Sequence, residues 1–464
     1  MVTSVMDRDR RVAILPALAV GIALVLGGGG SPAPLQEMVL QLTLAGLFAS
    51  WFWLLDETSR ASVPRAAWLV MLLALILPLL QLVPLSPSLW HALPGREIER
   101  QALALIGAED SWRPWTQAPA RTLASLLVVL PVAALIPMIA AATPRERNRV
   151  VLAVLAVAAL TMVVGGAQLS GGRGGALRFY EPLSAFLDGF QANHNSTADL
   201  LLVGMIAVAA VAHNRTERDG RLGNRRLLIA VTAGLTLLLG LGVVLTASRV
   251  GIALIPLALL AEVVILAPLL KADIALEPRK MLAGGVVLAV LLALGGLAFR
   301  QNPVLSGVVA RYNFTGELRP ELWRDSLYAI GQYFPFGSGM GNFVSSLLAA
   351  ERLEVVRENM PNRAHNDFLE LAVEGGIFGL LLLAAIAGVL FRAAYRSLRG
   401  SDKEGRGLYI FALASLLLLA LHSLVDYPFR SMALASLAAA CAGVILASPL
   451  RVRTGQAGNL EEQA

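Results

Sequence analysis

Long runs of apolar residues dominate the chain, and short segments rich in charge, glycine or proline separate them. A helix needs about 20 such residues to cross the hydrocarbon core of a bilayer. The pattern therefore predicts an all-α membrane protein with about twelve transmembrane helices. The expected spans are Val12–Gly28, Leu35–Leu55, Ala66–Ser86, Thr122–Ala142, Val150–Ser170, Ser196–His213, Leu227–Thr246, Val250–Leu270, Met281–Phe299, Phe368–Phe391, Gly407–Val425 and Ser431–Ser448.

Arginine and lysine are concentrated in alternate loops, for example at Arg8–Arg11, Arg215–Arg226 and Arg392–Arg406. Short cytoplasmic loops retain positive charge, so this set is assigned to the cytoplasm and both termini are expected there. The first apolar run is expected to be an uncleaved signal anchor, because many further spans follow it.

The chain shows no internal repeat, so residues 1–464 are expected to form a single polytopic membrane domain. Two long segments fall on the outer side, Pro87–Arg121 and Arg300–Asp367. The second, 300–367, is expected to be a helical periplasmic loop between spans 9 and 10 that carries part of an active site. Residues 449–464 are expected to form a cytoplasmic tail.

Composition excludes several classes of protein. Of 464 residues, 56% are hydrophobic and 15% are charged, whereas soluble domains carry about 25% charged residues. The net charge of +6 is spread through short loops, so nucleic acid is not an expected partner. Because Cys441 is the only cysteine, an intramolecular disulfide is impossible.

Histidines collect on the predicted outer side. His365 stands directly before a membrane helix and close to arginines, where a histidine can accept a proton near neutral pH. A structural role at the helix boundary is the alternative. For Asp367 and Glu370, three residues apart, an N-terminal capping box is the preferred interpretation. The histidines at or beyond outer helix ends are His91, His194, His365 and His422.

Among the arginines predicted on this side, three are candidates for chemistry. Arg249 lies at the junction of two apolar runs that are joined by almost no loop, and Arg311 and Arg319 lie in the 300–367 segment. A guanidinium presents a fork of donors that matches phosphate oxygens. These arginines are therefore candidates for an anion site, while snorkelling to the interface is the alternative for Arg249.

Other polar positions permit more than one interpretation. Asn193 and His194 precede a helix on the same side, and Asn195 or Ser196 suits the cap of that helix. His422 and Asp426 are four apart, share a helix face and are expected to pair structurally. The glycine pattern over 337–341 favours a tight turn over a phosphate cradle, because it lacks strand-turn-helix context.

The sequence contains no Walker loop, zinc-protease helix, cysteine pair or nucleophile elbow. Outer-face arginines with a boundary histidine suit group transfer from a lipid pyrophosphate, because arginine stabilises phosphate charge and histidine accepts a hydroxyl proton. The alternative is a proton-coupled transporter or lipid-carrier flippase that uses Glu262, Asp199 and Glu37. Glu262 is the one acid well inside a span, and either a proton relay or packing explains it.

Several short motifs occur in a fixed order along the chain. They are Gln81-Leu-Val-Pro-Leu85, Leu93-Pro-Gly-Arg96, Ala192-Asn-His-Asn195, Ala247-Ser-Arg-Val-Gly251, Arg319 followed by Leu322-Trp-Arg-Asp-Ser326, His365-Asn-Asp-Phe-Leu-Glu370, Glu374-Gly-Gly-Ile-Phe-Gly379 and His422-Ser-Leu-Val-Asp-Tyr-Pro428. In this order and in a twelve-span setting, they resemble the bacterial O-antigen ligase family, which includes Wzy-type O-antigen and exopolysaccharide polymerases.

The resemblance implies an inverting, metal-independent glycosyltransferase of GT-C-like helical architecture in the bacterial inner membrane, without a cofactor. The donor would be an undecaprenyl-pyrophosphate-linked glycan. The acceptor would be a glycan or the lipid A-core of lipopolysaccharide at the periplasmic face. Ligase and polymerase share donor, carrier and base, so the sequence leaves that choice open.

By position, His365 matches the family's catalytic base, and Arg249 and Arg319 match its pyrophosphate-binding arginines. The chain departs from the family at Ala192–Asn195, where Asn-Arg-Asn-His is common, and at Pro320, where leucine is usual. The further candidates for substrate binding are Asn193, His194, Arg311 and His422.

Overall fold

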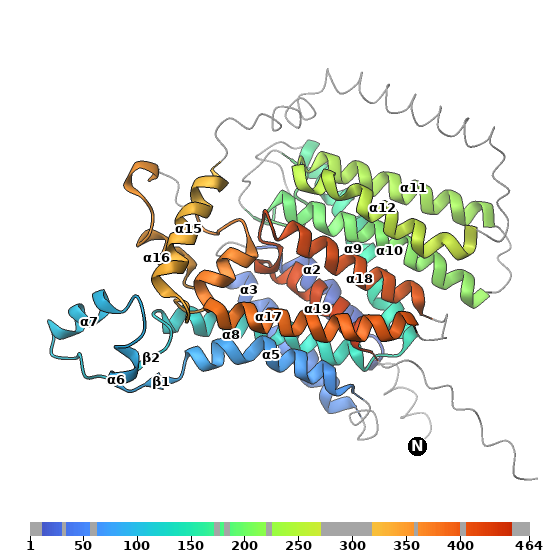
Figure 1. Ribbon diagram of the computed structural model, residues 1–464. Coiled ribbons are helices and arrows are strands. Elements are labelled where there is room, and N and C mark those ends of the chain that lie inside the picture. Colours follow the sequence, from blue (N-terminus) through green and yellow to red (C-terminus); the bar gives the residue numbers. More distant parts are fainter. Residues whose placement is uncertain are drawn as a thin grey trace, which may run out of the picture.

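The computed structural model describes residues 12–29, 34–55, 63–170, 177–180, 186–219, 225–270, 318–356, 361–399 and 405–447, and these are helical apart from one two-stranded ribbon and connecting turns (Figure 1). Seven described helices are long and apolar enough to cross a membrane. They are α3 (Pro34–Leu54), α8 (Pro119–Ala140), α9 (Pro144–Ser170), α10 (His194–Asp219), α11 (Arg225–Leu245), α12 (Arg249–Leu270) and α17 (Asp367–Arg399).

Four shorter apolar helices complete the bundle: α2 (Leu15–Leu26), α5 (Arg65–Gln81), α18 (Arg406–His422) and α19 (Met432–Leu446). The all-helical architecture predicted from the apolar runs is thus confirmed for the described residues. The expected span at Met281–Phe299 lies outside them, so the number of twelve spans stays a prediction, as does the GT-C-like arrangement.

Helix α10 lies at the centre of the bundle, packed against α9, α11, α12 and α18. Its residues from Leu200 to Ala210 are almost all buried, and a helix that is apolar on every side belongs in such a position. Gly204 brings the backbone of α10 against Ala158 of α9, because a small residue permits close helix approach. The outer faces of α11 and α12 instead expose leucines such as Leu237 and Leu260, which suits contact with lipid.

Residues 84–118 form a projecting segment, here called the arm, beyond the end of α5 (Figure 1). It contains β1 (Pro84–Leu85), α6 (Pro87–Trp90), α7 (Glu97–Ala104) and β2 (Arg113–Pro114), and the two strands pair antiparallel. The buried Arg96 pairs with Glu99 and donates to the backbone carbonyls of Pro114 and Trp115. The Leu-Pro-Gly-Arg motif therefore holds the arm together.

Helices α15 (Arg319–Tyr333) and α16 (Phe343–Leu348) are joined by a turn that contains the 337–341 glycines. Gly337, Gly339 and Gly341 have φ values of 77°, 113° and 79°, which only glycine adopts readily. The N–H groups of Ser338 and Gly339 donate to carbonyls of α17 at 2.9 Å. The predicted tight turn is confirmed, and its role is to dock the 335–341 segment on α17.

Helix α17 is interrupted where this turn meets it. Gly376 has φ 55° and ψ −149°, outside helical geometry, and Ile377 donates its N–H to the carbonyl of Pro335 at 3.0 Å. The buried Gln81 side chain donates to the Glu374 carbonyl at 3.0 Å and accepts from the Met340 N–H at 2.8 Å. The backbone groups released by the break are thus satisfied by the turn and by Gln81.

The segments predicted to lie on the outer side meet at one end of the bundle, where the arm, α15 and α16 are found (Figure 1). The Ala192 N–H donates to the Gly28 carbonyl beyond α2, and the Asp367 N–H donates to the Ser423 carbonyl beyond α18. Short 3-10 helices, η1 (Leu353–Val355) and η2 (Pro428–Arg430), belong to the same end. This end brings together the polar residues of the sequence motifs.

Candidate active site

His365 lies in the short segment before α17 and has a left-handed backbone, with φ 48°. That conformation is uncommon for a residue other than glycine and persists where surrounding contacts impose it. Here the Ala364 N–H donates to the Glu370 carboxylate at 3.0 Å, and the Ala364 carbonyl accepts from the Trp323 indole at 3.0 Å. Contacts on both sides of Ala364 therefore set the direction of the His365 side chain.

The N-cap of α17 is Asn366, whose side-chain oxygen accepts from the N–H groups of Phe368 and Leu369, each at 3.0 Å. Asp367 instead accepts from the Ser423 hydroxyl at 2.9 Å, and Glu370 binds the Ala364 N–H outside the helix. The capping-box interpretation of Asp367 and Glu370 is therefore wrong. Both carboxylates stabilise the segments that surround His365.

His365 pairs with Asp426, which lies between α18 and η2. The ring Nδ1 is 3.0 Å from Asp426 Oδ1, and the ring packs edge-on against Tyr427 at 4.9 Å between centroids. The Asn195 amide donates to the other Asp426 oxygen. The His365 side chain is 32% exposed and that of Asp426 is 3% exposed, so the buried carboxylate orients a histidine that reaches the surface.

Charge and hydrogen bonding keep Asp426 ionised. Burial raises the pKa of this carboxyl, but the hydrogen bond from His365 and the charges of His422, His365 and Arg319 outweigh burial, so the pKa lies below its usual value. When Nδ1 of His365 donates its proton to this carboxylate, Nε2 is left as the proton acceptor. This is the arrangement by which a carboxylate orients a catalytic base.

A second histidine and carboxylate lie behind the first pair. His422 Nδ1 is 2.6 Å from Asp199 Oδ1 of α10, and His422 Nε2 is 3.9 Å from Asp426 Oδ2. The side chains of both His422 and Asp199 are 1% exposed. The predicted pairing of His422 with Asp426 is thus an ionic contact beyond hydrogen-bond distance, while the hydrogen-bonded partner of His422 is Asp199.

Arg319 is the first residue of α15, near enough for its charge to act on Asp426 and His422. Arg249 is the first residue of α12, where Gly251 packs against Ala198 one turn into α10. Both arginines therefore belong to the same end of the bundle as His365. Arg311 lies outside the described residues.

Asn193 and His194 open α10 at this end as well. Asn193 accepts from the Asn195 N–H at 2.9 Å and hydrogen-bonds the Tyr427 hydroxyl, whose pKa burial raises to about 12. The His194 ring packs 5.7 Å from the Phe186 ring. Asn193 thus serves as a helix cap that also contacts the residue next to Asp426.

Sequence spacing did not indicate the ionic cluster beneath His365. Arg430 Nη1 is 2.8 Å from Glu374 Oε2, and its Nε is 3.3 Å from Glu370 Oε1 and 3.6 Å from Asp367 Oδ1. Arg363 adds a 3.0 Å contact to Glu370. The surrounding carboxylates raise the pKa of Arg430 despite the opposing effect of burial, so Arg430 holds η2 and the start of α17 together as a permanent cation.

We expect Arg430→Met to destabilise the protein by about 3–5 kcal/mol, because it leaves buried carboxylates without their shared cation. The measurement is the thermal unfolding midpoint of the purified protein in detergent. Arg100→Met is the control, since Arg100 pairs with Glu97 on the exposed surface of α7 and such pairs contribute little. Equal midpoints for Arg430→Met and wild type would show that this cluster does not stabilise the site.

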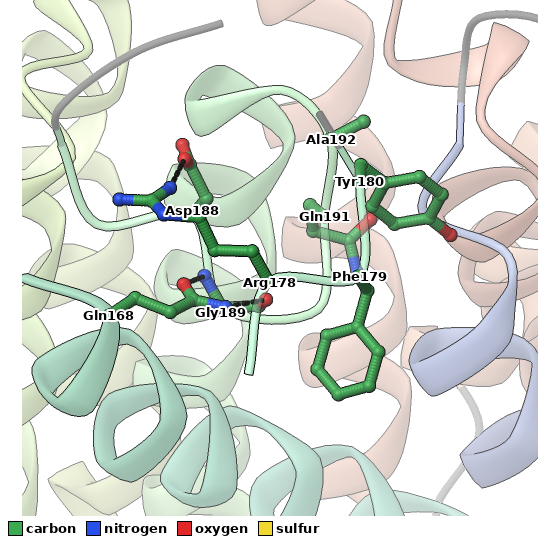
Figure 2. A pocket seen from close by; sticks show the side chains of 8 residues that line it. All are labelled: Gln168, Arg178, Phe179, Tyr180, Asp188, Gly189, Gln191 and Ala192. Atoms are coloured by element: carbon green, nitrogen blue, oxygen red, sulfur yellow. Dashed lines mark hydrogen bonds and ion pairs between the residues drawn. The ribbon is translucent and has the colours of Figure 1, made fainter. Parts of the chain in front are cut away.

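A small cavity lies beside the segment that leads into α10 (Figure 2). Its volume is about 10 Å³, room for no more than a single water. Arg178 and Asp188 form an ion pair at 3.1 Å, and Gln168 hydrogen-bonds the backbone of Gly189 on both its amide atoms (Figure 2). The cavity is therefore too small for a sugar or pyrophosphate, and its residues secure the backbone before Asn193.

Within the described ranges, no group of three or more histidine, cysteine, aspartate or glutamate side chains is arranged to hold a metal ion. The site instead offers an oriented histidine, a buried carboxylate and cationic side chains, all at one end of a helical bundle that suits a membrane. These features define a helical membrane protein with a candidate acid–base site.

Residues 234–384 match the family model described as O-antigen ligase. Over this third of the chain the sequence is similar to the O-antigen ligase family, which confirms the resemblance inferred from the motifs for the stretch that contains Arg249, Arg319 and His365. The match supports a membrane enzyme of O-antigen or polysaccharide assembly. No curated protein matches the chain.

Proposed function

We propose that the protein transfers an undecaprenyl-pyrophosphate-linked glycan to an acceptor hydroxyl at the periplasmic face of the bacterial inner membrane, as an O-antigen ligase or a polysaccharide polymerase. One observation carries the proposal: His365 pairs with the buried Asp426 within the reach of the Arg319 charge. This combination lies in a chain that is similar to the O-antigen ligase family over residues 234–384.

Charge at the opposite end of the bundle supports the periplasmic assignment. Helix α17 begins beside His365 and ends with Arg396 and Arg399 in its last turn. Helix α9 begins with arginines at 145, 147 and 149 and runs toward the site end. Because positive residues are retained in the cytoplasm, the end that carries His365 faces the periplasm in this proposal.

In the proposed reaction, His365 Nε2 takes the proton from the acceptor hydroxyl while the acceptor oxygen forms a bond to the anomeric carbon of the donor sugar. The bond from that carbon to the pyrophosphate oxygen breaks, and the electron pair leaves on the lipid pyrophosphate. Attack opposite the leaving group inverts the anomeric centre. Arg249 and Arg319 stabilise the phosphate charge that develops, which is the task of a guanidinium at such a site.

Asn193, His194, Arg311 and His422 remain candidates for substrate binding within this proposal. Asn193 and His194 stand at the start of α10 near the pair, whereas His422 is buried. Transfer of this kind uses the donor's own leaving group, so we propose no cofactor and no metal ion.

A gel of carrier-linked and surface glycans from a deletion strain tests the proposed function. Single repeat units that accumulate on the carrier would indicate a polymerase. Long polymer that stays on the carrier and is missing from lipid A-core would indicate a ligase. An unchanged glycan pattern, with wild-type complementation as the reference, would contradict both assignments.

Glu262 discriminates this proposal from a proton-coupled transporter. It is buried in α12, and one carboxyl oxygen accepts from the Thr236 hydroxyl of α11 at 2.9 Å. We expect Glu262→Gln to retain transfer within about twofold of wild type, because an amide can still accept this hydrogen bond. The rate is measured in membranes with and without a proton gradient, and loss of activity in the variant together with dependence on the gradient would favour transport.

A further inference from the structure

We infer that His422 is a positioning residue of the active site and is held as an imidazolium between Asp199 and Asp426. Its positive charge offsets part of the stabilisation that Asp426 gives to a protonated His365. The inference deepens the proposed function and rests on it only for the role of His365 as base. It concerns the buried His422–Asp199 pair, which the proposed reaction does not use.

The geometry of His422 carries the inference. Nδ1 is within hydrogen-bond distance of Asp199, at 2.6 Å, and Nε2 faces Asp426 Oδ2 at 3.9 Å. Nε2 is buried and has no hydrogen-bond partner. If Nε2 were unprotonated, its lone pair would point at a carboxylate, whereas a protonated Nε2 faces an opposite charge.

The charges around the pair agree with this protonation state. Asp199 faces His422 from α10 and Asp426 faces it from the segment before η2, while the charge of Arg319 acts on it from α15. His365 lies on the other side of Asp426 and contacts that carboxylate. Asp199 and Asp426 together bring two negative charges to one imidazole, while burial and Arg319 oppose its protonation. A single buried carboxylate would leave this balance open, but two carboxylates on opposite sides of the ring favour the cation.

The consequence for catalysis follows from the shared carboxylate. Asp426 stabilises a positive His365, and the His422 charge beside the other Asp426 oxygen offsets part of that stabilisation. His365 therefore releases its proton more readily after each transfer than it would beside an isolated Asp426. Asp199, which is 1% exposed like His422, supports this by balancing the His422 charge inside the bundle.

Nitrogen NMR of histidine-labelled protein in lipid nanodiscs tests the inference without any substrate. The chain has five histidines, and the signals of His422 are assigned by their loss in His422→Gln. In wild type at pH 7, both His422 ring nitrogens are expected to be protonated. A neutral His422 with one bare nitrogen in the wild-type protein would overturn the inference.

The paired variant His422→Gln with Asp199→Asn removes both charges together. We expect the His365 ring in this variant to titrate about half a pH unit to one unit higher than in wild type, because the nearer positive charge is gone. The acid limb of the transfer rate against pH is expected to move in the same direction. An unchanged His365 titration in a folded double variant would overturn the inference.

His91→Gln is the matched control, since His91 lies in the arm and hydrogen-bonds the Glu109 carbonyl at 3.0 Å. It is expected to leave the His365 signals unchanged. Failure of the two proposals is distinguishable: a deletion strain with normal glycans contradicts the proposed function, while the protonation state of His422 is read directly from the spectrum.

Discussion

Replacement of His365 by alanine is expected to reduce glycan transfer by about 10²–10⁴-fold, the contribution that a positioned general base makes. The variant removes the only proton acceptor that Asp426 orients toward the surface, at 3.0 Å. The Arg430 cluster and the Asn366 cap do not depend on the imidazole, so the segment before α17 is expected to fold normally. The measurement is the initial rate of transfer in membranes that contain equal amounts of wild type and variant.

His91→Ala is a matched control for this loss. His91 is also a partly exposed histidine at the same end of the bundle, and its ring bonds a backbone carbonyl in the arm. We expect the control to transfer at the wild-type rate. If His365→Ala keeps more than about a tenth of the wild-type rate, the histidine does not act as a general base of ordinary strength.

The helices were predictable because their signal is local. An apolar run of sufficient length specifies a spanning helix wherever it occurs, and the runs at α8, α11 and α12 match the observed helices to within a few residues. The first helix is shorter than its apolar run, since α2 covers Leu15–Leu26. The residues after Leu26 are still apolar, but their carbonyls bind other segments. The Gly27 carbonyl accepts from the Ala433 N–H of α19, and the Gly28 carbonyl accepts from the Ala192 N–H before α10.

The partners of the site histidines were not predictable in the same way. The spacing of four between His422 and Asp426 is a helical signal, and it led to the expectation that these two would pair. The observed hydrogen bonds join His365 to Asp426 across 61 positions and His422 to Asp199 across 223. Such contacts depend on how α10, α17 and α18 meet, which a periodic pattern does not encode.

The motif residues also divide into two groups that sequence alone did not separate. Gln81 and Arg96 bind backbone groups and fix the turn and the arm, so their role in the described structure is architectural. Glu370 and Glu374 bind Arg430. A capping box explained Glu370 by spacing alone, and only the packing of η2 against α17 reveals the cation that it serves.

Asp426→Asn is expected to lower transfer by about 10²–10⁴-fold while leaving His365 in place. The amide loses the charge that stabilises a protonated His365. If its nitrogen turns toward Nδ1, it also forces the proton onto Nε2, the atom that must accept one. If its oxygen turns toward Nδ1 instead, its nitrogen faces the Asn195 amide, which donates to the carboxylate in wild type. Two donors then face each other. Glu97→Gln is the control, because it neutralises an ion-paired carboxylate on the exposed surface of α7 and is expected to retain transfer.

The pH dependence of stability distinguishes the charge of Asp426 from its shape. Because its pKa is lowered in the folded protein, the ionised group contributes stability that is complete above the ordinary carboxyl value of about 4 and is lost as pH falls through the lower folded value. The difference in unfolding midpoint between wild type and Asp426→Asn should therefore not shrink between about pH 8 and 5, and should shrink only in stronger acid. A difference that disappears between pH 7 and 5 would mean that Asp426 takes up its proton in that range, and a carboxyl protonated there could not orient His365 as the base.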